Sequence, residues 1–424
     1  MKKIAALFLL LTSNLAIIAQ TMPKDADPKI WERALKIHRK AIIVDGHNDI
    51  PTPMSEQDYD LATPSTGKFH DDGDPFHSDL SRFKASGLTG EFFSIYVSGT
   101  TLKNGGAMRR AMELIDVTYR ATEKYPEQLI RCDTAAEIRN AKKRGKMCVL
   151  MGIEGGYAIE NSLAALREFY RLGVRYMTLT HNVTHDWADA HRDTPKNNGL
   201  SNFGKDVVRE MNRLGMFIDI SHVSEKVMND VLDVSTAPII ASHSGARGVN
   251  DHTRNVSDAV LKRVAKNGGV IMINFYPSFL DARTNKEENE RSAKLKPEID
   301  ALHEQFKTDP TGYNDAERKL FAVNPIYIAP YTRIVDHIAH IKMVTGSIEN
   351  IGIGSDFDGV PFLPDGMHGA EDLVLVTYEM LKRGYTEVEI RKVLGENLLR
   401  AMSQMEKVAG NRQISGQGSL KRIK

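Results

Sequence analysis

Cysteine is almost absent from this chain, with only Cys132 and Cys148 among 424 residues. Two cysteines cannot build the disulfide framework of a small secreted domain, and they are too few for a zinc site made of thiolates. Cys148 lies in an apolar run typical of a buried strand, and Cys132 lies in a connecting segment. A bridge between them is therefore possible but not favoured.

The chain also lacks an excess of charge of either sign. Its 56 Lys and Arg residues nearly balance its 55 Asp and Glu residues, which leaves a formal net charge of +1. This balance argues against nucleic acid or an acidic membrane surface as the main partner. We expect a small-molecule partner.

No apolar run after the first twenty residues approaches the roughly 20 residues that a membrane-spanning helix needs. Residues 1–20 begin with Met1-Lys2-Lys3 and continue into a short apolar centre from Ile4 to Leu11. This pattern predicts a secretory signal peptide over 1–20. We therefore expect a secreted or periplasmic protein whose mature form has no membrane span.

Short apolar runs of strand length recur along the chain, and we count eight of them against the template of a barrel. They lie near 41–45, 92–97, 147–153, 174–180, 216–220, 238–242, 269–274 and 350–355. Amphipathic helix patterns fall between them, at 107–122, 135–143, 163–171, 205–214, 224–232, 256–267 and 330–344. Strand and helix in alternation imply a parallel sheet, because each return needs a crossover. The sequence thus predicts an α/β fold, a single (β/α)8 TIM-like barrel over 21–409.

Three stretches depart from this alternation. Pro51 to Thr89 is rich in loop-forming residues and follows the first strand directly, so we predict that it forms a wall over the site. Phe279 to Asn324 is a charged insertion with a helical pattern, which could be a lid, a dimer surface or a solvated decoration. The basic, glycine-rich stretch 410–424 has no periodicity and is predicted to be a disordered tail.

Six of the apolar runs lead into residues that can bind a metal or move a proton. These endings are His47-Asn48-Asp49, Glu154, His181, His222, His243 and Asp356. Because the carboxyl ends of barrel strands lie on one face, we expect the six endings to meet at one polar site.

Three imidazoles and two carboxylates of this set form a candidate metal site, namely His47, Asp49, Glu154, His222 and His243. They can hold two divalent ions if one carboxylate bridges, with a position left open for water as a catalytic site requires. Imidazole and carboxylate ligands without thiolate suit Zn²⁺ first, and Mn²⁺ or Co²⁺ can substitute. A hydroxide shared by the two ions would be the nucleophile.

Asp356 ends the last predicted strand, in Gly354-Ser355-Asp356-Phe357-Asp358-Gly359. A carboxylate that faces the shared water without being tightly ligated could take its proton and pass it to a leaving nitrogen. Asp356 could instead cap the following turn. We favour the acid/base role for Asp356 and assign Asp358 to the turn.

Two further residues are candidates for binding substrate. His181 lies nearest the strand end in a patch that also holds His185 and His191, and its imidazole could stabilise the oxyanion of a tetrahedral intermediate. We regard His185 and His191 as non-catalytic. Arg254 could bind a substrate carboxylate through its two-pronged guanidinium, although a lone arginine beside a helix start is usually solvated.

The combined motifs resemble those of the membrane dipeptidase family, binuclear zinc peptidases on an amidohydrolase-like barrel. The segments are His47-Asn48-Asp49, Glu154-Gly155-Gly156, Ser221-His222, Ser242-His243-Ser244 and Gly354 to Gly359. The resemblance implies one zinc held by His47 and Asp49, a second held by His222 and His243, and a bridging Glu154.

The same resemblance implies roles for the remaining candidates. His181 would contact the substrate and the tetrahedral intermediate, Arg254 would receive the C-terminal carboxylate of a dipeptide, and Asp356 would shuttle the proton. The implied reaction is hydrolysis of a dipeptide bond, with tolerance of a D-residue on the C-terminal side possible. We also expect a homodimer. The long insertion at 279–324 departs from the family pattern.

Two other functions compete with this interpretation. One is another binuclear metal hydrolase on the same barrel, acting on a cyclic amide, a lactone or a phosphoester. Such enzymes often bridge their metals with a carboxylated lysine, whereas here the third strand offers Glu154 and the fourth ends in His181. The other is a non-catalytic metal-binding protein, but storage of metal needs no proton shuttle such as Asp356.

Overall fold

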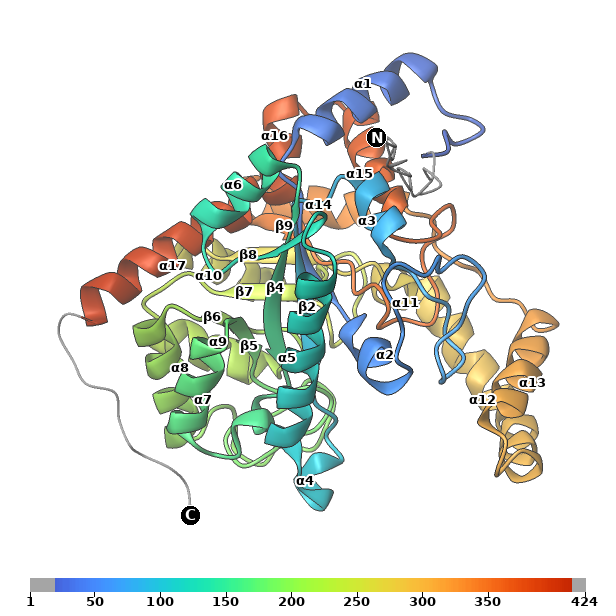
Figure 1. The fold of residues 1–424 in the computed structure, drawn as a ribbon, viewed down its shortest axis with the longest axis horizontal. Helices are drawn as coiled ribbons and strands as arrows, with labels where there is room; N and C mark the ends of the chain where they lie inside the picture. The colour runs from blue at the N-terminus through green and yellow to red at the C-terminus, as the bar shows by residue number, and fades with distance from the viewer. Residues whose placement is uncertain (1–19, 414–424) are drawn as a thin grey trace, which may run out of the picture.

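The computed structural model describes residues 20–413, and nearly all of the predicted signal peptide lies outside them. A sheet of nine parallel strands forms its centre (Figure 1). The strands are β1 (Val44–Asn48), β2 (Gly90–Tyr96), β3 (Leu129–Arg131), β4 (Met147–Glu154), β5 (Val174–Thr178), β6 (Phe217–Asp219), β7 (Ile240–Ser244), β8 (Val270–Ile273) and β9 (Ile351–Ile353).

Eight of these strands close into a ring. β2 pairs with β1 on one edge and with β4 on the other, and β9 completes the circle by pairing with β1. The predicted (β/α)8 barrel is thereby confirmed. β3 stands outside the ring, because it pairs only with the start of β4, where Leu129 lies beside Met147. β5 takes over the same edge of β4 from Met151 onward.

Helices fill the crossovers at the places that the sequence predicted. They are α5 (Ala107–Lys124), α6 (Ala135–Arg144), α7 (Leu163–Arg171), α8 (Asn202–Leu214), α9 (Glu225–Val234), α10 (Asp258–Asn267) and α14 (Thr332–Thr345). Local signals set several of their ends. Thr134 and Glu137 form a reciprocal capping box at the start of α6, and α8 ends at Gly215, whose φ of 85° costs glycine little.

Further helices cover the amino-terminal side of the barrel. α1 (Pro28–Lys40) packs against α15 (Val374–Lys382), and α17 (Asn397–Gln413) packs against α8. α17 includes residues 410–413, the first part of the stretch predicted to be a disordered tail. Residues 414–424 lie outside the described chain.

The two other irregular stretches meet beside the barrel. Between α2 (Pro51–Glu56) and α3 (Leu80–Ser86), residues 57–79 form a long loop. The insertion holds α12 (Ala282–Gln305) and α13 (Pro310–Ala322), a helical hairpin that projects from one side (Figure 1). The hairpin contacts the loop, since Asn314 donates to the carbonyl of Asp71 and the Arg318 guanidinium lies 3.9 Å from the centre of the Phe69 ring.

Large apolar side chains fill the interior of the barrel. They include Val44, Phe92, Leu150, Tyr176, Phe217, Ile240, Val270 and Met272. Tyr176 can extend across this interior because its neighbour Gly152 has no side chain. A Cβ on Gly152 would lie only 2.0 Å from the Tyr176 ring. Packing thus places the Tyr176 hydroxyl at the carboxyl-terminal end of the barrel, where the polar strand ends lie.

The two cysteines form a disulfide, so the preference for leaving them unpaired was wrong. The cause is β3, which sequence reasoning missed because it spans three residues. β3 pairs Ile130 with Cys148, so the chain delivers Cys132 beside β4 with the two Cα atoms 5.4 Å apart. That distance lies within the usual range for a disulfide. Separately, among residues 20–413 no helix combines the length and apolarity that crossing a bilayer requires.

Candidate metal centre

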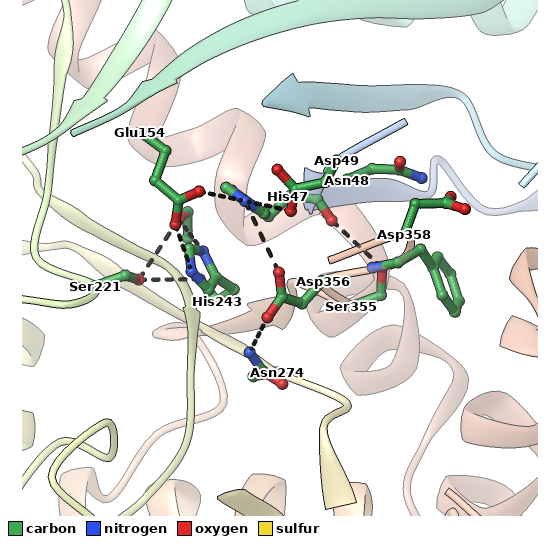
Figure 2. A network of polar contacts seen from close by, with 12 residues as sticks. His47, Asn48, Asp49, Glu154, Ser221, His243, Asn274, Ser355, Asp356 and Asp358 are labelled. Atoms are coloured by element: carbon green, nitrogen blue, oxygen red, sulfur yellow. Dashed lines mark hydrogen bonds and ion pairs between the residues drawn. The ribbon is translucent and has the colours of Figure 1, made fainter. Parts of the chain in front are cut away.

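The five predicted ligands converge at the carboxyl ends of four barrel strands. His47 lies in β1 with Asp49 just beyond it, Glu154 ends β4, His222 follows β6 and His243 lies in β7. His47 Nε2 lies 3.2 Å from Asp49 Oδ2 and 3.5 Å from Glu154 Oε2. Figure 2 shows Glu154 and Asp356 directed toward His47 from two sides. Folding therefore gathers residues that are far apart in the sequence, from position 47 to position 243.

The two oxygens of Glu154 face different histidines. Oε2 faces His47, whereas Oε1 lies 3.0 Å from His222 Nε2 and 3.4 Å from His243 Nε2. A carboxylate placed in this way can serve two adjacent cation sites at once. Burial alone would raise the pKa of Glu154, but the surrounding histidines, His47 first among them, bring it well below its ordinary value.

The donor atoms fit a divalent metal. His47 Nε2 is buried without a hydrogen-bond partner although three carboxylates lie near it. Burial would lower the pKa of His47, but Tyr176, Glu154 and Asp49 together raise it well above its usual value. The pocket thus strongly favours positive charge at this point. Nitrogen and oxygen donors without thiolate suit zinc and related ions.

His222 and His243 form the other half of the donor set. Their Nε2 atoms lie 2.9 Å apart and both face Glu154 Oε1. Burial, followed by the charge of Arg254 for His222 and of His47 for His243, puts both pKa values well below normal. Both imidazoles are therefore neutral, and their Nε2 lone pairs are directed at one point. A cation at that point could bind both nitrogens. Glu154, His222 and His243 bring their ligand atoms within 4.8 Å of one another, and so do His47, Asp49 and Glu154.

Each of the three imidazoles also has a partner at its outer nitrogen, Nδ1. The partners are the Tyr176 hydroxyl at 2.7 Å from His47, Asn182 Oδ1 at 3.3 Å from His222 and Ser242 Oγ at 2.8 Å from His243. A partner that accepts at Nδ1 fixes the ring orientation and favours the tautomer whose Nε2 lone pair faces the cluster. Ser242 belongs to a quoted motif, but the sequence predicted a supporting role for none of the three partners.

Asp356 lies at the edge of this cluster. Its Oδ1 is 3.8 Å from His47 Nε2, and its Oδ2 accepts a hydrogen bond of 2.8 Å from Asn274. Burial raises the pKa of Asp356 to about 7, and the nearby carboxylates of Asp49 and Glu154 add to the rise while His47 opposes it. A carboxyl group with a pKa near neutrality can both accept and donate a proton.

The backbone at two of these residues adopts an unusual conformation. His222 has φ of 63° and Asp356 has φ of 66°, in the left-handed region that non-glycine residues rarely occupy. Such conformations cost of order 1–3 kcal/mol and are held in place by their surroundings. Here the Asp356 N–H donates to the carbonyl of His47, which ties the last strand end to the first. From these positions both side chains reach the cluster.

A cavity of about 540 Å³ opens above the cluster, and His181 and Arg254 both line it. The His181 ring lies 4.4 Å from the His222 ring and 5.0 Å from the Tyr96 ring. Burial lowers the pKa of His181, so its imidazole is neutral and can donate one N–H.

Arg254 is buried in the wall of the same cavity, so the usual expectation of a solvated arginine does not hold. Of its two terminal nitrogens, one donates to the His243 carbonyl at 3.1 Å and the other to Ser244 Oγ at 3.4 Å, while Nε has no partner. Burial lowers the pKa of Arg254 to about 10, which leaves it protonated at neutral pH. A buried cation with donors to spare can bind an anionic group of a ligand.

The residues set aside as non-catalytic have structural partners. Asp358 pairs with His70 at 3.2 Å and accepts from the His77 N–H, so it anchors the 57–79 loop. His185 bonds the carbonyl of Leu179. His191 lies in the cavity wall and contacts Asn182 Oδ1, the atom that also faces His222, so it stands closer to the site than expected.

Comparison with known proteins agrees with this geometry. The model of the membrane dipeptidase family, peptidase family M19, matches residues 31–416. The chain belongs to the membrane dipeptidase family. Membership identifies it as a hydrolase of a metallopeptidase family and supports dipeptidase activity.

Several solved structures are similar to this chain. The probable dipeptidase PvdM from Pseudomonas aeruginosa has a TM-score of 0.76 at 24% identity, over 90% of this chain and 99% of the other, which shows the shared fold. Dipeptidase AC, a metallopeptidase of family M19, has a TM-score of 0.67 at 25% identity over 86% and 98%. A metallopeptidase from Rhodobacter sphaeroides, liganded with a phosphinate mimic of the dipeptide L-Ala-D-Ala, has a TM-score of 0.66 at 25% identity over 86% and 100%.

Proposed function

We propose that this protein is an exported, zinc-dependent dipeptidase that holds two zinc ions per chain. The observation that carries the proposal is the position of Glu154, whose two oxygens face separate groups of buried ligands. One ion would be held by His47 and Asp49, and the other by His222 and His243. Glu154 would bridge them, and Mn²⁺ or Co²⁺ could replace zinc.

A metal pair held by these residues would supply a hydroxide nucleophile at neutral pH and would polarise the carbonyl of the scissile bond. The proton steps belong to the protein. Asp356 would accept the proton of the attacking water at its Oδ1, which faces the cluster, while Asn274 holds Oδ2 and so fixes the direction of the carboxyl group. Asp356 then donates the proton to the leaving amine, for which a pKa of about 7 is well suited.

Arg254 and His181 orient the substrate in this proposal. The guanidinium of Arg254 receives the C-terminal carboxylate of a dipeptide, because it is a buried cation in the wall of the cavity. The neutral imidazole of His181 donates to the oxyanion of the tetrahedral intermediate. The ligand of the Rhodobacter sphaeroides relative mimics an L-D dipeptide, which supports including such dipeptides among the substrates.

Export has independent support from the disulfide. Bridges such as Cys132–Cys148 persist in oxidising compartments and are rare in the cytosol. Together with the signal-like pattern of residues 1–20, this supports secretion or a periplasmic location.

A substrate panel tests the proposed function. Purified protein loaded with zinc should cleave L-Ala-L-Ala and L-Ala-D-Ala, lose activity with a chelator and regain it when zinc is added back. Lactones and phosphotriesters serve as the comparison substrates. Preference for those substrates would show a different hydrolase on the same barrel, and two bound ions without turnover of any substrate would show a metal-binding protein.

A further inference from the structure

Asp219 lies below the metal centre, in the interior of the barrel, and the mechanism above gives it no role. It ends β6, is fully buried and accepts hydrogen bonds at both carboxylate oxygens. Oδ1 accepts from the backbone N–H groups of Ser242 at 2.8 Å and Ser221 at 3.0 Å. Oδ2 accepts from Ser242 Oγ at 2.6 Å and from Thr178 Oγ1 at 2.5 Å. All four donors are uncharged.

The hydroxyl of Ser242 connects this carboxylate to a predicted metal ligand. Ser242 Oγ lies 2.6 Å from Asp219 Oδ2 and 2.8 Å from His243 Nδ1. A serine hydroxyl has one proton and two lone pairs. Because the carboxylate can only accept, the serine proton points to Asp219, and the serine oxygen must accept a proton from His243.

This order of donors fixes the tautomer of His243. Nδ1 carries the ring proton, so Nε2 keeps a free lone pair directed at Glu154 and His222, where the metal is expected. The Ser242 oxygen, polarised by the carboxylate behind it, becomes a stronger acceptor and makes the imidazole a better electron donor.

The other two histidines lack this connection to a carboxylate at Nδ1. The partner of His47 is the Tyr176 hydroxyl, and the partner of His222 is the side-chain amide oxygen of Asn182. Among the three histidines, within residues 20–413, only the Nδ1 contact of His243 leads onward to a buried carboxylate. The two halves of the centre therefore differ in the support behind their ligands.

We propose that Asp219 and Ser242 are positioning residues that hold His243 as a metal ligand through the relay Asp219–Ser242–His243. This inference rests on the proposed role of His243 at the second zinc site. It predicts that the relay sets the affinity of that site, and that the site of His47 and Asp49 is affected much less.

The test measures metal binding directly. Zinc would be titrated into metal-free protein against a chromophoric chelator, and cobalt absorption spectra would report the geometry of each site. In Asp219→Asn the amide nitrogen that replaces Oδ2 donates instead of accepting, so the serine proton loses its acceptor. In Ser242→Ala the relay is cut. Each variant should lower the affinity for one of the two ions by about 10- to 100-fold, the usual cost of losing such support.

Thr178→Val is the matched control. It removes another donor to the same Asp219 oxygen but leaves the relay intact. If Asp219 only stabilises the barrel, all three variants should lower the thermal midpoint of the metal-free protein while zinc affinity stays unchanged, and the proposal is refuted. If the relay operates, Thr178→Val should bind both ions normally.

The double variant Asp219→Asn/Ser242→Ala adds a further criterion. If the two residues act in one relay, the double variant should lose about as much zinc affinity as Ser242→Ala alone. Additive losses would contradict the relay. Should Asp219→Asn fail to fold, Ser242→Ala and Thr178→Val still decide the question. Wild-type protein that binds fewer than two ions would instead refute the proposed binuclear centre, which separates the two failures.

Discussion

Reduction of the Cys132–Cys148 bridge should measurably destabilise the protein. The two residues are 16 positions apart in the sequence, and closing a loop of this size in the unfolded chain contributes about 3 kcal/mol to stability. The entropy of unfolding is about 2 cal/mol/K per residue, or roughly 0.8 kcal/mol/K for a chain of this length. The expected loss of midpoint temperature is therefore about 4 °C.

The assay compares metal-free protein with and without a phosphine reductant, which avoids both zinc binding by thiols and stabilisation by the metal. The matched variant Cys132→Ala/Cys148→Ala should unfold at one temperature in both buffers. That variant alone would overstate the effect of the bridge, because both sulfurs are buried and their removal also leaves space in the core. An unchanged midpoint on reduction, or two reactive thiols in unreduced denatured protein, would refute the reasoning.

Four further predictions concern the site and the dependence of stability on pH. Asp356→Asn should retain both metals but lower kcat by a factor of about 10² or more. Near-normal turnover would contradict the acid/base role of Asp356. Glu154→Gln should weaken the binding of both ions together. Metal analysis that finds two ions retained per chain would contradict the bridging role of Glu154. Arg254→Ala should slow the hydrolysis of dipeptides with a free carboxylate more than that of their amidated forms. Equal losses of activity would show that the carboxylate does not bind at Arg254. Burial lowers the pKa of His38 to about 4, so His38 should contribute up to about 3 kcal/mol of stability that is present above pH 6.5 and lost as the pH falls toward 4. Urea unfolding of the wild type and of His38→Gln across this range should show a shallower decline in the variant.

The parts of the fold that repeat could be predicted from the sequence. Most barrel strands are buried apolar runs and most crossovers hold an amphipathic helix, so the eight barrel strands and the seven helices predicted between them were placed within a few residues. The first crossover is an exception, because α2 and α3 lie within the stretch 51–89 that was predicted to be loop-like. The first strand was predicted at 41–45 but spans Val44–Asn48, because its polar residues, which we took for a strand ending, belong to the strand itself. The five candidate ligands were chosen by the same logic, since polar residues at the ends of parallel strands must meet, and the structure brings them together.

The rest depends on which side chains meet across the closed barrel. Tyr176 reads as an ordinary core residue, and only Gly152 in another strand reveals that it can cross to His47. Asp219 gave a weak signal, a lone carboxylate within an apolar strand, but its partner Ser242 lies in the next strand. The disulfide was missed together with the three-residue strand that makes it possible.

The close approach of Gly152 and Tyr176 ties the stability of the barrel to its chemistry. Replacing a strand glycine with a branched residue is a common way to stiffen a sheet, but any side chain at 152 would collide with the Tyr176 ring. The ring would have to move, and His47 Nδ1 would then lose its hydrogen bond to the Tyr176 hydroxyl. Attempts to stiffen this strand would therefore disturb the proposed metal centre.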